Sequence, residues 1–172
     1  MEISEYFSSV WKGDIEKYKY SGKALVDKVE WGDRVLDVGC GYNYFSDKIP
    51  LVTGIDPYND SADIKVSIED FDCAVPYDKI FCLGSINFGE YQTIQNQIGK
   101  VVSLLKPGGT IYWRQNPGLA DHGNQECKDI PFFEWSFEHN LHFAKLAGCE
   151  VSMLAWDTDN RIYAEWIKNE TA

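Results

Sequence analysis

The residues with the clearest chemical potential form a glycine-rich turn made of Gly39, Cys40 and Gly41. A short apolar run, residues 35–38, precedes the turn and predicts a buried parallel strand. Because glycine has no Cβ, the backbone of such a turn can approach a ligand closely, and we expect its N–H groups to point into open space. Asp37, just before the turn, could accept hydrogen bonds from a ligand amine or hold the loop.

A second candidate residue is Asp56, which ends the next apolar run at residues 51–55. In a doubly wound fold, an acid at the end of the second strand, about 20 residues after a glycine loop, binds the two hydroxyls of a ribose. The loop lacks the third glycine of the dinucleotide pattern, because Asn43 and Tyr44 follow Gly41. A pyrophosphate therefore has less room, and the pattern favours a nucleoside without phosphate.

Four segments, in this order, resemble the motifs of class I S-adenosylmethionine (SAM)-dependent methyltransferases. They are residues 35–41 (VLDVGCG), 54–56 (GID), 77–84 (YDKIFCLG) and 104–109 (LLKPGG). The resemblance covers about residues 20–168. It implies a Rossmann-like α/β fold with a seven-stranded, mostly parallel sheet and an antiparallel C-terminal strand. We expect a single domain, residues 1–172, with an N-terminal helical cap at 1–30 and the core at 31–172.

The resemblance also implies a SAM site, in which the glycine turn frames the methionine part and Asp56 holds the ribose. The expected cofactor-binding residues are Asp37, Gly39, Cys40, Gly41, Asp56, Pro57, Ser67, Ile68, Glu69, Leu83 and Gly84. One position departs from the family pattern, because Ser67 stands where the family usually has an acid that contacts the adenine amine. Glu69 or Asp70 could serve instead, or both could be solvated loop acids.

The expected reaction is an in-line displacement at the sulfonium methyl of SAM. The leaving group is good, so the protein mainly has to position the two reactants and exclude water. By resemblance Asn87 would lie near the reacting methyl, but it lacks the following Pro-Pro of adenine-N6 and glutamine methyltransferases. His122, in a long loop at residues 115–135, could take a proton from the acceptor, or it could be a surface histidine.

The composition limits the classes of molecule to which the acceptor can belong. The 172 residues carry a net charge of −11 with a pI near 4.6, which argues against a nucleic-acid substrate because such binding depends on phosphate neutralisation. A small-molecule acceptor, or a small docked protein partner, is therefore expected. The five cysteines show no CxxC spacing, so no metal site is expected, and no apolar run is long enough for a membrane span. With no secretory signal at the N-terminus, we expect a cytoplasmic protein. The oligomeric state stays open.

The pattern of apolar residues predicts the elements that position these residues. Helices are expected at residues 3–11, at 21–29 with Ser21 as the cap, at 42–48, at 94–105, and from Ser136 to Gly148 with Leu141 on its apolar face. Strands are expected at 35–38, 51–56, 64–68, 79–83, 110–113, 150–156 and 162–167. The last two would form a hairpin through the turn at residues 157–160.

Two other functions stay open at this stage. The chain could be a non-catalytic module that uses a methyltransferase fold to bind SAM, S-adenosylhomocysteine (SAH) or a protein partner. A nicotinamide-dependent oxidoreductase is the third possibility, and the incomplete glycine pattern disfavours it.

Overall fold

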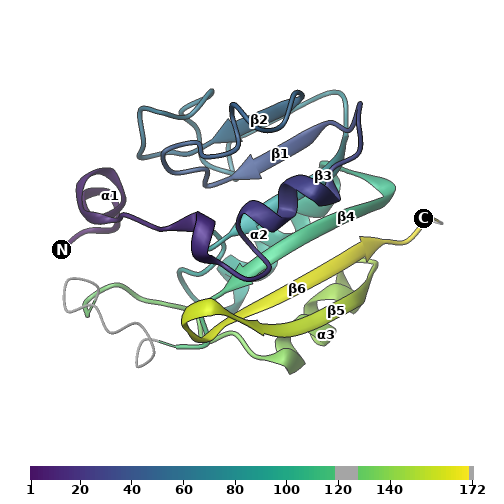
Figure 1. Ribbon diagram of the computed structural model, residues 1–172. Coiled ribbons are helices and arrows are strands. Elements are labelled where there is room, and N and C mark those ends of the chain that lie inside the picture. The colour runs from purple at the N-terminus through teal and green to yellow at the C-terminus, as the bar shows by residue number, and fades with distance from the viewer. Residues whose placement is uncertain (119–127, 171–172) are drawn as a thin grey trace.

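The computed structural model describes residues 1–118 and 128–170, and its centre is a twisted six-stranded sheet (Figure 1). The strand order is β2-β1-β3-β4-β6-β5. The strands are β1 (Val35–Val38), β2 (Val52–Ile55), β3 (Tyr77–Leu83), β4 (Leu105–Gln115), β5 (Cys149–Asp157) and β6 (Arg161–Lys168). The first four strands pair in parallel, whereas β6 is antiparallel to both of its neighbours, β4 and β5. The fold class, the antiparallel last strand and the closing hairpin are thus confirmed.

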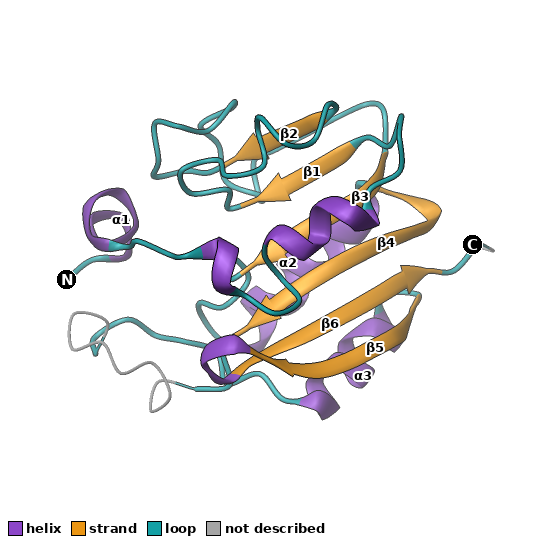
Figure 2. Cartoon of the chain, in the orientation of Figure 1, coloured by secondary structure: helices purple, strands orange, loops and turns teal. Residues whose placement is uncertain are grey.

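The sheet is covered on both faces (Figure 2). On one face, α2 (Tyr91–Ser103) and α3 (Phe137–Leu146) pack in one hydrophobic cluster with β-strand side chains such as Ile80 and Trp113. On the other face, residues 15–29 of the N-terminal segment pack in a second cluster that contains Phe81 and Tyr112, while residues 3–11 pack in a third cluster with Phe88 and Phe132. Each strand of the centre is therefore buried on both sides, as its continuous apolar sequence predicted.

The prediction of a strand at residues 64–68 is wrong. Only a single bridge joins Ile64 to Ile55, so the sheet has six strands and not seven. The link from β2 is too short for a crossover helix, and it closes on β2 directly. Asp63 accepts the Gly54 N–H at 2.8 Å, and the Asp63 and Ile64 N–H groups both donate to the Gly54 carbonyl. The outer side of β2 is thereby capped by a loop.

Three helix predictions also need correction. Residues 42–48 form consecutive turns, because Asn43 adopts a positive φ of 62° that interrupts a right-handed helix. The N-terminal residues form a short α-turn, α1 (Ile3–Glu5), that continues as a π-helix, Tyr6–Val10. Residues Lys23–Lys28 form a 3₁₀-helix without a side-chain cap.

The last helix is confirmed in extent but not in its buried face. Ser136 caps α3 by accepting the His139 N–H at 3.0 Å. Leu141 is 55% exposed, and the buried residues of α3 are Asn140, Phe143 and Ala144. Asn140 can be buried because its amide pairs with that of Gln115 on β4 at 2.7 and 2.9 Å.

The buried carboxylate of Asp157 joins the N-terminal segment to the hairpin. It accepts the N–H groups of Tyr20 and Ser21 at 3.1 Å each and the Ser21 hydroxyl, so Ser21 binds Asp157 and does not cap a helix. It also accepts from Arg114 on β4 at 3.1 Å and from the Thr158 N–H at 2.8 Å. Burial alone would raise the pKa of Asp157, but these donors outweigh it and lower the pKa.

We predict that Asp157→Ala destabilises the protein by about 3–5 kcal/mol, because Arg114 and three backbone amides lose their partner. Urea unfolding followed by circular dichroism measures this change. The matched control is Asp60→Ala, which removes a fully solvated ion pair with Lys65 and should leave the unfolding midpoint unchanged. Equal midpoints for the two variants would contradict the anchoring role of Asp157.

Candidate functional site

The carboxyl ends of the four parallel strands meet at one edge of the sheet, and a cavity of about 310 Å³ opens there. Ligands bind at this edge in open α/β sheets. Ten of the residues expected from the sequence line the cavity: Gly39, Gly41, Asp56, Pro57, Ser67, Ile68, Glu69, Leu83, Gly84 and Asn87. Asp37 and Cys40 lie next to the cavity wall without lining it. His122 lies outside the described residues.

The backbone conformation of the turn requires glycine at positions 39 and 41. Gly39 and Gly41 have φ values of 69° and 56°, a region that strains residues with a Cβ. A Cβ on Gly39 would lie 2.3 Å from the Cβ of Ser85, which follows β3. The turn therefore packs directly against the loop after β3, and this close approach forms one side of the cavity.

The expectation that the N–H groups of this turn point into open space is wrong. Those of Gly39 and Cys40 donate to the Ile55 carbonyl at 2.8 and 3.0 Å, and that of Gly41 donates to Asp56 at 3.0 Å. The first turn is thus bonded to the end of β2. It offers a ligand a closely approachable backbone, while its amide donors are used to fix the loop.

Asp56 is the residue that links the two loops. Its buried carboxylate accepts the N–H of Gly41 and, on the other oxygen, those of Tyr58 and Asn59 at 2.8 and 3.1 Å. A carboxylate has about four acceptor positions. With three amides bound, Asp56 keeps acceptor capacity for one more donor, which a ligand hydroxyl in the cavity can supply.

Asp37 is an acid held in an unfavourable environment. It is 4% exposed, and its carboxylate receives no hydrogen bond from the described residues. Burial, followed by repulsion from Asp56 and Asp63, raises its pKa from 3.8 to about 7. Burial and the same acids also raise the pKa of Cys40, so this thiol stays protonated and is a poor nucleophile.

At the far side of the cavity, α2 contributes a residue that the sequence did not reveal. Gln97 lines the cavity and donates through Nε2 to Glu69. Since a carboxylate only accepts, this bond fixes the amide orientation, and the buried Oε1 of Gln97 has no partner among the described residues. The hydroxyl of Ser67, which also lines the cavity, donates to Asp70 at 3.2 Å. Gln97 flanks the apolar stripe of its helix, so its sequence context carries no signal of a site.

Asn87 lines the cavity, and its side chain bonds to two backbone groups. Its Nδ2 donates to the Gly84 carbonyl at 3.1 Å, and its Oδ1 accepts the Asn116 N–H at 3.1 Å. It therefore joins the loop after β3 to the loop after β4 and fixes the shape of the cavity wall. A direct catalytic role for Asn87 stays a prediction.

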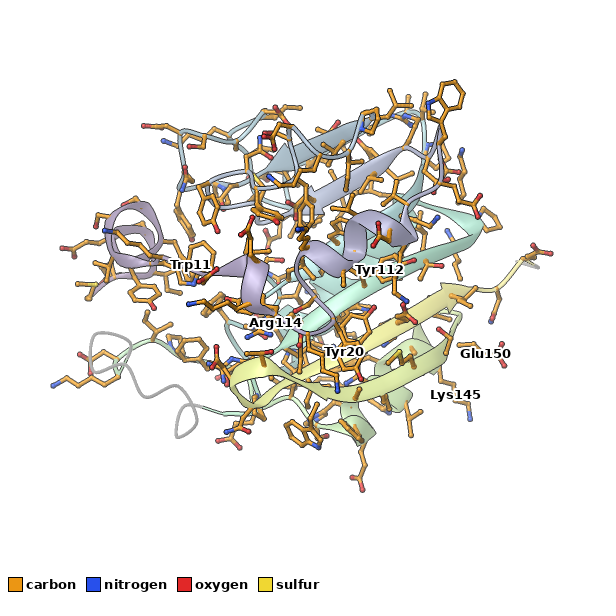
Figure 3. All side chains as sticks on the ribbon, in the orientation of Figure 1. Trp11, Tyr20, Tyr112, Arg114, Lys145 and Glu150 are labelled. Carbon is orange, nitrogen blue, oxygen red and sulfur yellow. The ribbon has the colours of Figure 1, made fainter. Side chains whose placement is uncertain are left out.

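Aromatic side chains of the N-terminal segment cover the cavity on the face of the sheet where this segment packs. Trp11 lies against the glycine turn, 3.0 Å from where a Cβ on Gly41 would be, and stacks on Tyr42 with ring centroids 5.8 Å apart. Phe7 contacts Phe88 at 5.3 Å. Figure 3 shows Trp11 and Arg114 on the side of the sheet that this segment covers, and both line the cavity.

The comparisons with known proteins rest on structure. No family model matches the sequence, and no curated protein matches it either. Among solved structures, a putative methyltransferase in complex with the Trm112 methyltransferase activator of Haloferax volcanii is similar with a TM-score of 0.69. It is 18% identical over 87% of this chain and 89% of that one.

Two further structures contain a bound nucleoside. Magnesium protoporphyrin IX methyltransferase from Synechocystis PCC 6803, with bound SAM, has a TM-score of 0.67 and is 14% identical over 97% of this chain and 95% of that one. The 1,6-didemethyltoxoflavin-N1-methyltransferase of Burkholderia thailandensis, with SAH, has a TM-score of 0.66 and 13% identity over 80% and 71%. The chain therefore has the Rossmann-like fold of SAM-dependent methyltransferases. None of the helices in residues 1–118 and 128–170 has the length and apolar content needed to cross a membrane.

We predict that Asp37→Asn stabilises the protein increasingly as the pH rises from about 4 to 7, with little further change above pH 7. The folded-state pKa is raised to about 7, so the folded protein binds a proton that the unfolded chain has lost, and wild-type stability falls across this window. The full pKa difference corresponds to about 4 kcal/mol, which is an upper bound for the gain. Urea unfolding at several pH values measures it.

Asp72→Asn is the matched control, since Asp72 is 91% exposed and pairs with Lys100 at the surface. Its stability relative to wild type should not change over the same pH range. A constant difference between Asp37→Asn and wild type from about pH 4 to 7 would show that Asp37 ionises normally.

Proposed function

We propose that this protein transfers the methyl group of SAM to a small-molecule acceptor by direct in-line displacement. The observation that carries the proposal is the cavity at the carboxyl ends of β1–β4, where the glycine turn, Asp56, the segment 67–69 and Gly84 converge. Similar structures contain SAM or SAH, and their names give small acceptors, among them 1,6-didemethyltoxoflavin and an amino pentose. These facts support the cofactor and the acceptor class together.

In this proposal each part of the cavity binds one part of SAM. Asp56 accepts from a ribose hydroxyl with its remaining lone pair. Ile68 supplies an apolar wall for the adenine ring, and the buried Oε1 of Gln97 accepts from the adenine amino group. The Gly39–Ser85 contact brings the backbone close to the methionine part.

The acids around the glycine turn favour a cationic ligand. Burial, with added repulsion from Asp56, raises the pKa of Asp37, and a ligand ammonium or sulfonium would relieve the part due to repulsion. SAM supplies an electrophilic methyl on a positively charged sulfur. The acceptor lone pair forms the new bond to the methyl carbon, the carbon–sulfur electron pair returns to sulfur, and the acceptor loses its proton to solvent or to a base. The protein's part is to align the reactants and exclude water with its aromatic cover.

We predict that the wild-type protein binds SAM and SAH with micromolar affinity, and that Asp56→Ala loses this binding because both the ribose contact and the loop anchor disappear. Isothermal titration calorimetry measures both. Asp60→Ala, an exposed acid in the adjoining loop, is the control and should bind like wild type. Absence of binding by folded wild-type protein would refute the methyltransferase proposal and favour a partner-binding module.

We further predict that Gln97→Leu weakens SAH binding about five- to tenfold, in line with the loss of one hydrogen bond. The control is Gln92→Leu on the same helix, where Gln92 is exposed and bonds to Asn96. S-inosylhomocysteine, which has an oxygen in place of the amino group, should bind wild type more weakly than SAH and should bind Gln97→Leu about as well as SAH does. Undiminished discrimination in Gln97→Leu would assign adenine recognition to another residue.

A further inference from the structure

The arginines of this chain are concentrated at the cavity. Only three of the 16 basic residues are arginines, and two of them, Arg114 and Arg161, line the cavity. No lysine is among the described residues that line it. The chain has a net charge of −11, so this placement is not explained by a generally basic surface.

Arg114 lies beside the proposed reacting centre. On β4 it pairs with Leu83 of β3, and its carbonyl accepts the Gly84 N–H at 2.9 Å. Its register thus puts it next to the strand end where the sulfonium is expected. Because residues alternate faces along a strand, its side chain lies on the same face as Tyr112, under the N-terminal segment.

The guanidinium of Arg114 is held rigidly but is not saturated. It donates to Ser21, to Asp157 and to the Thr158 carbonyl at 3.3, 3.1 and 2.9 Å, and the ring of Tyr18 lies 3.7 Å from it. These bonds use both Nη1 hydrogens and one Nη2 hydrogen. One Nη2–H and the Nε–H have no partner among the described residues, although the side chain is buried.

The remaining wall on this side is aromatic and carries a second arginine. Phe88 contacts Phe7 and Phe132 with centroids 5.3 and 5.1 Å apart, and all three rings line the cavity. Arg161, the first residue of β6, also lines it and donates to the Asp159 carbonyl at 2.9 Å. Asp159 also lines this part of the wall, and Asp157 pairs with Arg114 behind it, so the arginines supply the N–H donors that face the cavity here.

We propose that the acceptor is an aromatic carboxylic acid, whose flat body lies against the phenylalanine rings and whose carboxylate is bound by Arg114 with Arg161. Arginine suits this role because its planar fork matches a carboxylate and stays charged when buried. A cationic amine would meet N–H donors there and would find no free acceptor on either guanidinium. This inference rests on the proposed methyl transfer, since it names the acceptor of that same site.

The test measures the charge preference of the acceptor pocket in protein saturated with SAH. Calorimetric titrations with benzoate and 2-naphthoate are compared with the neutral amides, the corresponding benzylic amines and phenyl phosphate. We expect at least one carboxylate to bind about tenfold or more tightly than its own amide, and the amines to bind more weakly still. Tighter binding of phenyl phosphate than of either carboxylate would overturn the proposal and indicate that the acceptor carries a phosphate.

Variants assign that preference to the arginines. Arg161→Gln and Arg114→Lys should reduce the carboxylate-to-amide ratio to about one or two while SAH affinity stays near the wild-type value. Arg34→Gln is the matched control, because Arg34 bonds to the Val75 and Pro76 carbonyls outside the cavity, and it should keep the full ratio. Arg114→Lys retains a charge for Asp157, and Arg161→Gln tests the pocket independently if the first variant fails to fold.

The two proposals fail in different ways. Lack of SAH binding by folded wild-type protein would overturn the proposed function. Normal SAH binding with no preference for carboxylates, or with a preference for amines or amides, would overturn only the acceptor inference. An unchanged ratio in Arg161→Gln and Arg114→Lys would also overturn it.

Discussion

The carboxylate of Asp56 is the interaction on which the rest of the cavity depends. It joins the end of β2 to the glycine turn after β1 by accepting the Gly41 N–H, and it holds its own following loop through two more amides. Three charge-assisted bonds to backbone make this carboxylate a rigid corner. Gly39 can then pack against Ser85 after β3, so the first three strand ends become one connected surface.

A second constraint follows from the number of acids at this corner. Asp37 lies beneath the turn with Asp56 and Asp63 nearby, and Asp63 caps the outer side of β2 by accepting the Gly54 N–H. Burial of Asp37, to which the local negative charge adds, opposes its ionisation and raises its pKa. On the other side of the sheet centre, Arg114 and Arg161 line the cavity, with Asp157 paired to Arg114. The two parts of the cavity thus differ in what they present, carboxylate acceptors on one side and guanidinium donors on the other.

The features that sequence reasoning found are those encoded over short distances. The glycine turn, the acid ending β2, the Ser136 cap and the hairpin turn each depend on a few neighbouring residues. Their types follow from backbone geometry alone, so their positions could be predicted with no knowledge of the tertiary structure.

The features that it missed join residues far apart in the chain. The amide of Gln97 is oriented by its hydrogen bond to Glu69, which lies outside the helix of Gln97. Arg114 and Ser21 both bond to Asp157, which is far from either in the chain. The predicted strand at 64–68 does not form, because the linker before it is too short. The prediction that the turn amides are free is wrong, because their acceptors come from the end of β2. In each case the sequence specifies the residue type, but the partner is determined by packing.

The contact between Asp157 and the N-terminal segment also orders events during synthesis. Tyr20 and Ser21 leave the ribosome 137 and 136 residues before the carboxylate that binds them, and the loop that they close is nearly the whole chain. Tyr18 can contact Arg114, and Leu25 can pack with Phe81 and Tyr112, before the hairpin emerges, but the Asp157 carboxylate and Tyr163 are added only with it. A nascent chain therefore carries every glycine of the binding loop well before the N-terminal segment has its full set of partners.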